Sequence, residues 1–187
     1  MTRFYHEVSG LRAARASRQI AAKGSEPRPG LAIVGVGMMG REHLRVARLL
    51  GRSVIQGVFD QSVQSLAETD RLMSLTGDPA LHHYASLQEV FADPAVDAVI
   101  ISTPNYTHWE VVSAALQSTK ALLVEKPMAT RLEDALAMVE AVRHYSGLFQ
   151  LGMQYRFKAQ YVDLFAEVKN ARALGAIKTI SMSEYRP

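Results

Sequence analysis

The fold of this chain is decided by the stretch LAIVGVGMMG, at Leu31–Gly40. Its first part, Leu31–Gly37, is a short apolar run that ends in glycine, which is typical of a strand buried on both faces. The next residues, Met38–Leu50, carry apolar side chains near helical spacing. The sequence therefore predicts a buried strand, a glycine-rich turn and a helix in direct succession.

The glycines of this turn have the spacing G-x-G-x-x-G, which binds dinucleotides where a strand leads into a helix. Gly35 allows the tight turn, Gly37 lets the backbone approach a pyrophosphate, and Gly40 lets the helix pack closely on the strand. The N-terminus of the helix, at Met38 and Met39, supplies N–H donors and the positive end of the helix dipole. The pattern alone is a weak signal, so the prediction depends on the strands, helices and motifs further along the chain.

Strand and helix patterns alternate as far as Gly152. Strands are predicted at 54–60, 96–102, 121–124 and 148–153, with a weak one at 82–84, and helices at 62–75 (stopped by Gly77 and Pro79), 86–91, 106–116 and 132–144. Ser86 and Glu89 have the spacing of a capping box. Helices of this length between strands imply right-handed crossovers and a parallel sheet, which is a Rossmann-type, doubly wound α/β fold.

The pattern changes after Gly152. Residues 158–172 have the apolar spacing of a helix, and residues 176–183 (AIKTISMS) alternate as a half-buried strand does. A lone strand, however, has no sheet to join. We therefore expect a basic extension at 1–30, a dinucleotide-binding domain at 31–152, and at 153–187 only the first helix and strand of a truncated second, α+β domain.

Composition narrows the class of protein. Apolar residues make up 48% of the 187 residues and charged residues 21%, and there is no cysteine. No apolar run approaches the roughly 18 residues that a membrane span needs. We expect a soluble, cytoplasmic protein without a disulfide, a cysteine nucleophile or a metal site.

Most of the net charge of +3 lies near the N-terminus. Residues 1–30 carry six Lys or Arg against two Glu, a balance of +4, so the rest of the chain carries −1. We see no basic stripe of the kind that binds nucleic acid. The leader is either an organellar transit peptide, because such peptides are basic and amphipathic, or a disordered extension or upstream start.

Asp60 lies 20 residues beyond Gly40, at the end of the next predicted strand. An acidic side chain at this place can bind the ribose hydroxyls of adenosine, and it would repel a 2′-phosphate. No arginine comes directly after it to bind such a phosphate, so we predict NAD rather than NADP. The alternative is that Asp60 only caps the next helix.

A second motif, Ser102-Thr103-Pro104-Asn105, stands at the carboxyl end of a predicted strand. Open α/β sheets bind their ligands at that edge, so these residues are expected to line the path of the cofactor. The alternative is an ordinary turn, in which the proline ends the strand and the polar residues cap the next helix.

The third motif, Glu125-Lys126-Pro127, stands at the same edge, and Lys126 is the candidate catalytic residue. Alcohol oxidation requires that a proton leave the hydroxyl as the hydride is transferred. A partly desolvated lysine beside a cationic nicotinamide gives up its own proton more easily and can assist that transfer. The alternative is a surface lysine in a loop, which is what most lysines are.

Taken in order, the motifs GVGMMGREH, VFD, STPNYTHWEVVSAAL, LLVEKPMATRLEDA, LGMQYRF and LGAIKTIS resemble the glucose–fructose oxidoreductase and inositol dehydrogenase (Gfo/Idh/MocA) family. The resemblance runs from about Leu31 to Pro187. It implies that Gly35, Gly37, Gly40 and Asp60 form the dinucleotide site. The other family positions that bind or approach the cofactor fall on Thr103, Pro104, Asn105, His108, Glu125, Lys126 and Arg156.

The resemblance also implies roles for single residues. The lysine that matches Lys126 takes part in catalysis, and the arginine that matches Arg156 lies near the nicotinamide and the substrate. His43 matches a histidine that we expect to pack rather than to catalyse. The family's catalytic aspartate and histidine belong to the second domain and would fall beyond Pro187, so we expect little turnover from this chain alone.

We therefore predict an NAD(P)-dependent oxidoreductase, with NAD favoured over NADP, that transfers a hydride between the cofactor and a sugar, inositol or related polyol. The family further implies a homo-oligomer for the full-length protein. The alternative is a catalytically silent dinucleotide-binding fragment or module with a regulatory or partner-binding role. Neither nucleic acid nor a membrane is expected as a partner.

Overall fold

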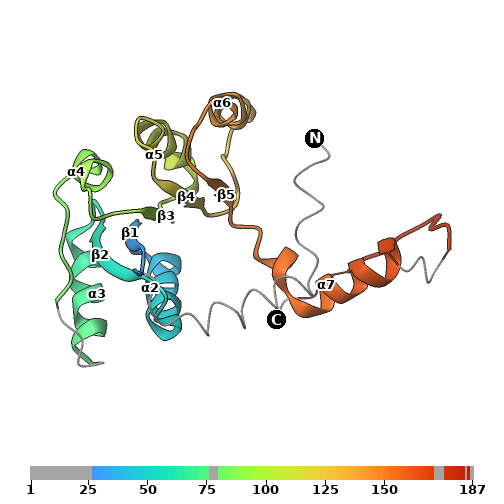
Figure 1. Cartoon of the computed structure of the whole chain (residues 1–187), viewed down its shortest axis with the longest axis horizontal. Helices are drawn as coiled ribbons and strands as arrows, with labels where there is room; N and C mark the ends of the chain where they lie inside the picture. The colour runs from blue at the N-terminus through green and yellow to red at the C-terminus, as the bar shows by residue number, and fades with distance from the viewer. Residues whose placement is uncertain (1–26, 76–79, 171–174, 184, 186–187) are drawn as a thin grey trace. The chain divides into compact units, whose positions relative to one another are not determined.

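The computed structural model describes residues 27–75, 80–170, 175–183 and 185 (Figure 1). Contacts along the chain separate two compact units, of which one is Pro27–Gly152 and the other contains Met153–Pro187. The basic leader up to residue 26 and the predicted helix stop at 77–79 lie outside the described residues.

A five-stranded parallel sheet forms the centre of the Pro27–Gly152 unit (Figure 1). Its strands are β1 (Gly30–Val34), β2 (Val54–Phe59), β3 (Ala98–Ile101), β4 (Ala121–Val124) and β5 (Phe149–Leu151), in the order β2-β1-β3-β4-β5. His83 adds a single parallel bridge to Val58 of β2, where the sequence predicted a weak strand. With that bridge the order is that of a Rossmann fold, so the predicted fold class is confirmed.

Five helices of this unit connect the strands in its described residues. They are α2 (Met38–Leu50), α3 (Val63–Leu75), α4 (Leu87–Ala92), α5 (His108–Ala115) and α6 (Leu132–Arg143), with a 3₁₀ turn, η1 (Asn105–Thr107), before α5. The predicted capping box is present: the Ser86 hydroxyl oxygen accepts the Glu89 N–H at 3.2 Å, and the Glu89 carboxylate accepts the Ala85 N–H at 2.8 Å. None of the described helices has the length and apolar character that crossing a bilayer requires.

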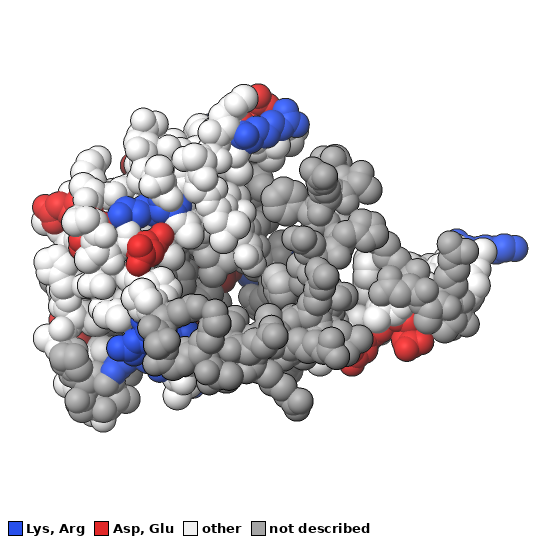
Figure 2. Space-filling model, in the orientation of Figure 1, with Lys and Arg blue, Asp and Glu red and all other residues white. Residues whose placement is uncertain are grey.

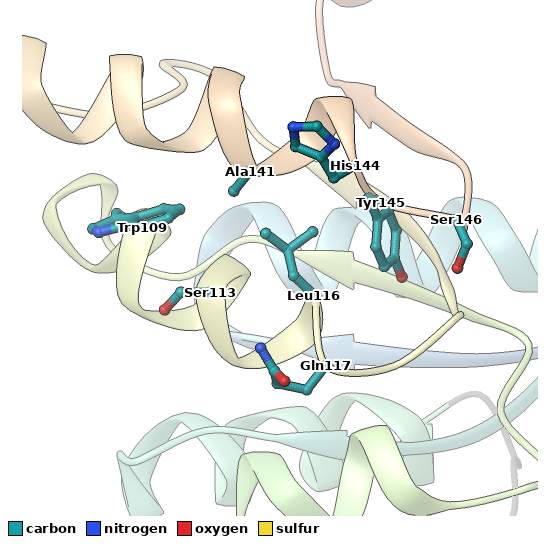
Figure 3. A pocket seen from close by; sticks show the side chains of 8 residues that line it. All are labelled: Trp109, Ser113, Leu116, Gln117, Ala141, His144, Tyr145 and Ser146. Carbon is teal, nitrogen blue, oxygen red and sulfur yellow. The ribbon is translucent and has the colours of Figure 1, made fainter.

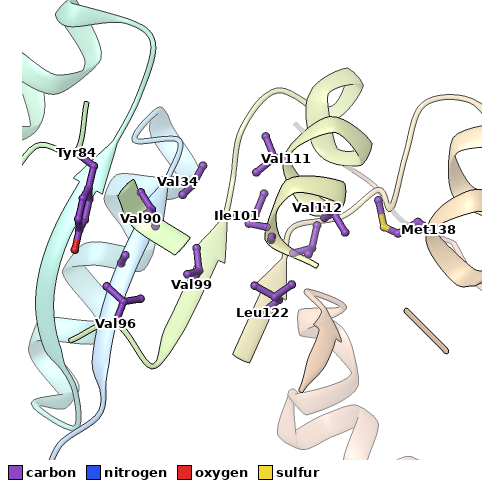
Figure 4. Packing of buried hydrophobic residues seen from close by; sticks show 13 residues of the cluster. Val34, Tyr84, Val90, Val96, Val99, Ile101, Val111, Val112, Leu122 and Met138 are labelled. Atoms are coloured by element: carbon purple, nitrogen blue, oxygen red, sulfur yellow. The ribbon is translucent and has the colours of Figure 1, made fainter. Parts of the chain in front are cut away.

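The side chains of β1 alternate between two hydrophobic cores, one on each face of the sheet. Ala32 and Val34 belong to the core that packs against α4, α5 and α6 (Figure 4). Leu31 and Ile33 belong to the core on the opposite face, which includes side chains of α2 and α3. Helices therefore cover both faces, which is why β1 is apolar at every position rather than at every second one.

Charged side chains of this unit pair along their own helices. Three such pairs are spaced i,i+3 and exposed: Glu42–Arg45, Glu68–Arg71 and Glu140–Arg143. On the face that Figure 2 shows, some of the described Lys and Arg side chains lie beside Asp and Glu. Exposed pairs of this kind contribute little to stability, because water and salt screen them.

The unit that contains Met153–Pro187 is helical over most of 154–170, and its described residues beyond 174 are not helical. It has a 3₁₀ turn, η2 (Gln154–Phe157), then α7 (Ala159–Phe165) and a π-helical segment, η3 (Ala166–Asn170). The strand predicted at 176–183 is wrong, because these residues form no strand and are exposed. A strand needs a neighbour to take its backbone hydrogen bonds, and the alternating pattern alone does not supply one.

Candidate functional site

The three glycines of the turn after β1 differ in how much space a side chain would have. Gly35 has a φ of +88°, and a Cβ there would lie 2.6 Å from the Thr103 backbone nitrogen. A Cβ at Gly40 would lie 1.9 Å from the Gly35 carbonyl oxygen. Gly37, the N-cap of α2, is different, because a Cβ there would meet nothing within 4 Å. The fold itself thus requires the first and third glycines, whereas the second borders open space at the N-terminus of a helix.

Three hydrogen bonds, besides one to Asp60, hold this turn against its neighbours. The Gly35 N–H donates to the Phe59 carbonyl oxygen at 2.8 Å, at the end of β2. The Ser102 hydroxyl, after β3, donates to the Gly35 carbonyl oxygen at 2.7 Å. Arg41 on α2 donates from Nη1 to the Val36 carbonyl oxygen at 2.8 Å. Ser102, predicted as a cofactor residue, therefore uses its hydroxyl to fix the turn.

Asp60 binds backbone amides with both of its carboxylate oxygens. Oδ2 accepts the Val36 N–H of the glycine turn at 2.8 Å, and Oδ1 accepts the Ser62 N–H at 2.8 Å, just before α3. Two roles were open for this residue from the sequence, capping or ribose binding. The structure gives the cap of α3 to Ser62, whose hydroxyl oxygen accepts the Ser65 N–H at 3.2 Å. Asp60 accepts the N–H of Ser62 before the helix begins, and its carboxylate lies directly against the glycine turn.

A hollow of about 230 Å³ lies beside Asp60. It brings together Gly35, Asp60, Thr103 and Pro104, which three separate sequence motifs predicted. The other residues that line it are Phe59, Gln61, Ser62, Leu87, Tyr106, Thr107, Glu110 and Val111. No local sequence signal indicated the helical members of this set, because only the folded chain brings α4 and α5 to the end of β2.

The turn after β3 is tied to itself by hydroxyl groups. The Thr107 Oγ1 lies 2.9 Å from the Thr103 Oγ1 and 2.8 Å from the Pro104 carbonyl oxygen. Asn105 is exposed in η1. The segment is therefore the turn that ends β3, which was one of the two alternatives from the sequence. Thr103 and Pro104 in this turn also line the hollow.

His108, the first residue of α5, is wholly buried. Its Nδ1 lies 2.9 Å from the Pro127 carbonyl oxygen, and its Nε2 lies 3.1 Å from the Thr103 carbonyl oxygen. The ring therefore joins the segment after β3 to the segment after β4.

Glu125 is a buried carboxylate at the end of β4, with 6% of its surface exposed. Its Oε1 lies 2.8 Å from His43 Nε2 on α2, and its Oε2 accepts the Lys126 N–H at 3.1 Å. His43, expected only to pack, thus joins the helix of the glycine turn to the Glu-Lys-Pro segment. Nothing in the sequence indicated this pair, whose members are 82 residues apart.

Lys126 is exposed at the carboxyl edge of the sheet, and its peptide bond to Pro127 is cis. Its ammonium group forms no ion pair or hydrogen bond with any residue that the structure describes. Arg156 lies in η2, in the other unit, so its predicted place near the nicotinamide stays a prediction.

A second hollow, of about 350 Å³, lies between α5 and α6 (Figure 3). Trp109, Leu116, His144 and Tyr145 are among its lining residues. None of the predicted site residues lines it. His144 is exposed, as expected from the sequence for a residue at a helix end.

The fold and the glycine turn together define a dinucleotide-binding Rossmann protein. Residues 30–153 match the Gfo/Idh/MocA family, described as an oxidoreductase family with an NAD-binding Rossmann fold. The chain belongs to this family.

Similar proteins include two that carry a named activity. The chain is 36% identical to inositol 2-dehydrogenase of Mycolicibacterium smegmatis over 135 residues. These residues make up 72% of this chain and 38% of that protein. It is 33% identical to inositol 2-dehydrogenase 3 of Saccharopolyspora erythraea over 145 residues, and these make up 76% of this chain and 41% of that protein. An NAD-binding protein of Listeria innocua superposes with a TM-score of 0.61 at 31% identity, over 77% of this chain and 41% of that one. The chain thus spans about two fifths of the length of these relatives.

Proposed function

We propose that the Pro27–Gly152 unit binds NAD and forms the cofactor half of an oxidoreductase that acts on a secondary alcohol of an inositol, a sugar or a related polyol. The observation that carries this proposal is the open space at Gly37, with the Asp60 carboxylate bound to the same turn. The family and the named activity of the relatives support the reaction class and the substrate class.

The residues of the turn fit a dinucleotide. The first N–H groups of a helix have no carbonyl partner within it, so those at the start of α2 are available to a pyrophosphate. Gly37 has no side chain to block that approach. Asp60 uses one lone pair of each oxygen on an amide and keeps others for ribose hydroxyls. The hollow beside it offers the apolar surfaces of Phe59 and Leu87 to a purine base.

The charge of Asp60 supports NAD over NADP. Two like charges about 4 Å apart repel by about 4 kcal/mol at an effective dielectric constant of about 20, and a partly exposed site retains a fraction of this. A fraction of about 1.4 kcal/mol already corresponds to a tenfold preference. We therefore expect NAD to bind at least about tenfold more tightly than NADP.

When bound, the nicotinamide ring accepts or donates the hydride. The side chain of Lys126, without a partner among the described residues, would accept the proton that the substrate hydroxyl loses when it is a neutral amine, and would return it as an ammonium group in the reverse reaction. Glu125 holds the backbone of Lys126 through its N–H and is itself held by His43. The two residues thus have different roles, proton transfer for Lys126 and positioning for Glu125.

Calorimetric titration of the chain with NAD, NADP and ADP-ribose tests the proposal. We expect saturable binding of NAD, weaker binding of NADP, and binding of ADP-ribose, because the contacts proposed for Gly37 and Asp60 involve only the pyrophosphate and the adenosine ribose. Absence of binding by both NAD and ADP-ribose would refute the proposal. The cytoplasmic location, the homo-oligomer and the place of Arg156 near the nicotinamide stay predictions.

A further inference from the structure

The buried carboxylate of Glu125 lies where three segments of the Pro27–Gly152 unit meet. Its Oε1 lies 2.8 Å from His43 Nε2, on α2, and its Oε2 accepts the Lys126 N–H at 3.1 Å. A Cβ built on Gly152, directly after β5, would lie 3.3 Å from the same Oε1. Glu125 is 6% exposed, so water has little access to replace these partners. The carboxylate therefore joins α2 to the segments that follow β4 and β5.

His43 and the proposed pyrophosphate site lie on one helix. Gly37 is the N-cap of α2, and a helix rises by about 1.5 Å per residue, so His43 lies about 9 Å further along the axis. Leu44, beside it, is buried in a hydrophobic core, whereas the His43 side chain is 23% exposed and contacts the carboxylate of Glu125. A change in the order of the first turn of α2 can therefore reach Glu125 through a short, hydrogen-bonded stretch of helix.

We propose that His43 is a positioning residue, which couples the first turn of α2 to the placement of Lys126 through Glu125. The link needs only an N–H on Nε2 that donates to the carboxylate, and no change of charge on the ring. The inference rests on the proposed function, in which a pyrophosphate lies at this turn and Lys126 transfers the proton. A ligand that orders the turn then also orders the backbone at Lys126, a group that it does not touch.

The size of the coupling follows from the contact that carries it. The loss of one hydrogen bond to a carboxylate changes an equilibrium by about tenfold. Coupling between two sites is also reciprocal, so the link that lets a ligand order Lys126 makes the ordered form of Lys126 the form that binds the ligand better. We therefore expect a ligand at α2 to reduce the local opening of the Lys126 N–H by about tenfold.

ADP is the probe that separates this coupling from direct contact. It carries adenosine and a pyrophosphate but lacks the second ribose and the nicotinamide, which are the parts of NAD nearest to Lys126 in the proposed complex. Amide hydrogen exchange of the ¹⁵N-labelled chain, followed in proton–nitrogen spectra, reports the opening of the Lys126 N–H. We expect saturating ADP to slow this exchange by about tenfold, while the amides in the middle of α6 keep their rates.

His43→Gln and His43→Asn are a matched pair of variants. Both introduce an amide, but glutamine places its nitrogen near the position of the imidazole Nε2, whereas asparagine is one methylene shorter and cannot reach Glu125 Oε1. Both variants should bind ADP. We expect ADP to slow the Lys126 N–H in His43→Gln and to leave it unchanged in His43→Asn. A contact that served stability alone would not make this amide respond to ADP.

The possible outcomes keep the two proposals apart. Exchange at Lys126 that does not respond to bound ADP in the unmodified chain would overturn the inference, as would an equal response in folded His43→Asn. If His43→Asn does not fold, the response of the unmodified chain and of His43→Gln to ADP still decides. If neither NAD nor ADP binds, the proposed function fails. The positioning role is then decided without ligand, because it requires faster exchange of the Lys126 N–H in His43→Asn than in His43→Gln, and equal rates would overturn it.

Discussion

Replacement of Gly37 by alanine separates the stability of the fold from the binding of a dinucleotide. Gly37 has φ −62° and ψ −162°, which any residue adopts, and the added methyl group would meet nothing within 4 Å. Alanine is a poorer N-cap than glycine, so we expect a cost of about 0.5–1 kcal/mol in the free energy of unfolding. For a unit of this size that corresponds to a fall of roughly 2–5 °C in the melting temperature.

The same methyl group would occupy the space through which a pyrophosphate approaches α2. A hydrogen bond between an amide and a charged group contributes about 1.5–3 kcal/mol. The loss of one such bond, at about 1.4 kcal/mol per factor of ten, weakens binding by about 10- to 150-fold. Gly37→Ala should therefore lose most of its affinity for NAD but only the small amount of stability given above.

Calorimetric titration with NAD and thermal unfolding followed by circular dichroism measure the two effects. Leu49→Ala, at an exposed position near the other end of α2, is the matched control and should change neither. Gly40→Ala should lose both, because its Cβ would lie 1.9 Å from the Gly35 carbonyl oxygen. A folded Gly37→Ala chain that binds NAD as tightly as the unmodified chain would show that this turn does not hold the pyrophosphate.

Three further substitutions test other parts of the unit. Asp60→Asn removes the charge with little change in shape and should reduce the preference for NAD over NADP by about fivefold or more in parallel titrations, so an unchanged ratio would contradict the charge argument. Glu125→Gln removes the charge from the contact with His43 and should lower the free energy of unfolding in urea by about 1–2 kcal/mol, whereas an unchanged midpoint would show that the pair is not stabilising. The Tyr84 hydroxyl donates to Asp93 and holds the pKa of that carboxyl below its ordinary value of 3.8, so Asp93 adds stability above that value and loses it as the pH falls further. Tyr84→Phe should therefore make unfolding less dependent on pH in the acid range, as pH titrations of the melting temperature would show.

The fold could be predicted because its signals are local. Leu31–Val34 is apolar at every position, which is the pattern of a strand covered on both faces, and Gly35 and Gly40 are required by the tight turn that such a strand makes into a helix. The strand predicted at 176–183 was wrong because its formation depends on more than a local signal. An alternating pattern states only which face of a strand is apolar, and the strand also needs a neighbour that no local signal provides.

The candidate site was predictable to the same extent. Gly37, Asp60 and Lys126 could be proposed from the sequence because each stands next to the end of a strand, and the carboxyl ends of parallel strands share one edge of the sheet. The contact between His43 and Glu125 could not be found in this way. It depends on how α2 packs over the end of β4, which is a property of the whole sheet rather than of either segment.

The segments at the carboxyl edge of the sheet are fixed in two different ways. We therefore expect substitutions beside β1 and β2 to have different effects from substitutions beside β3 and β4. At β1 and β2 the glycine turn is fixed by steric limits at Gly35 and Gly40, so a change there either breaks the fold or, as at Gly37, blocks a ligand directly. At β3 and β4 the segments beyond the sheet are fixed by the buried polar side chains of His108 and Glu125. We expect a substitution of either residue to leave the strands of the sheet in place and to shift the segments that follow β3 and β4. Affinity for the adenosine half of a dinucleotide should therefore respond to the first side, and the placement of Lys126 to the second.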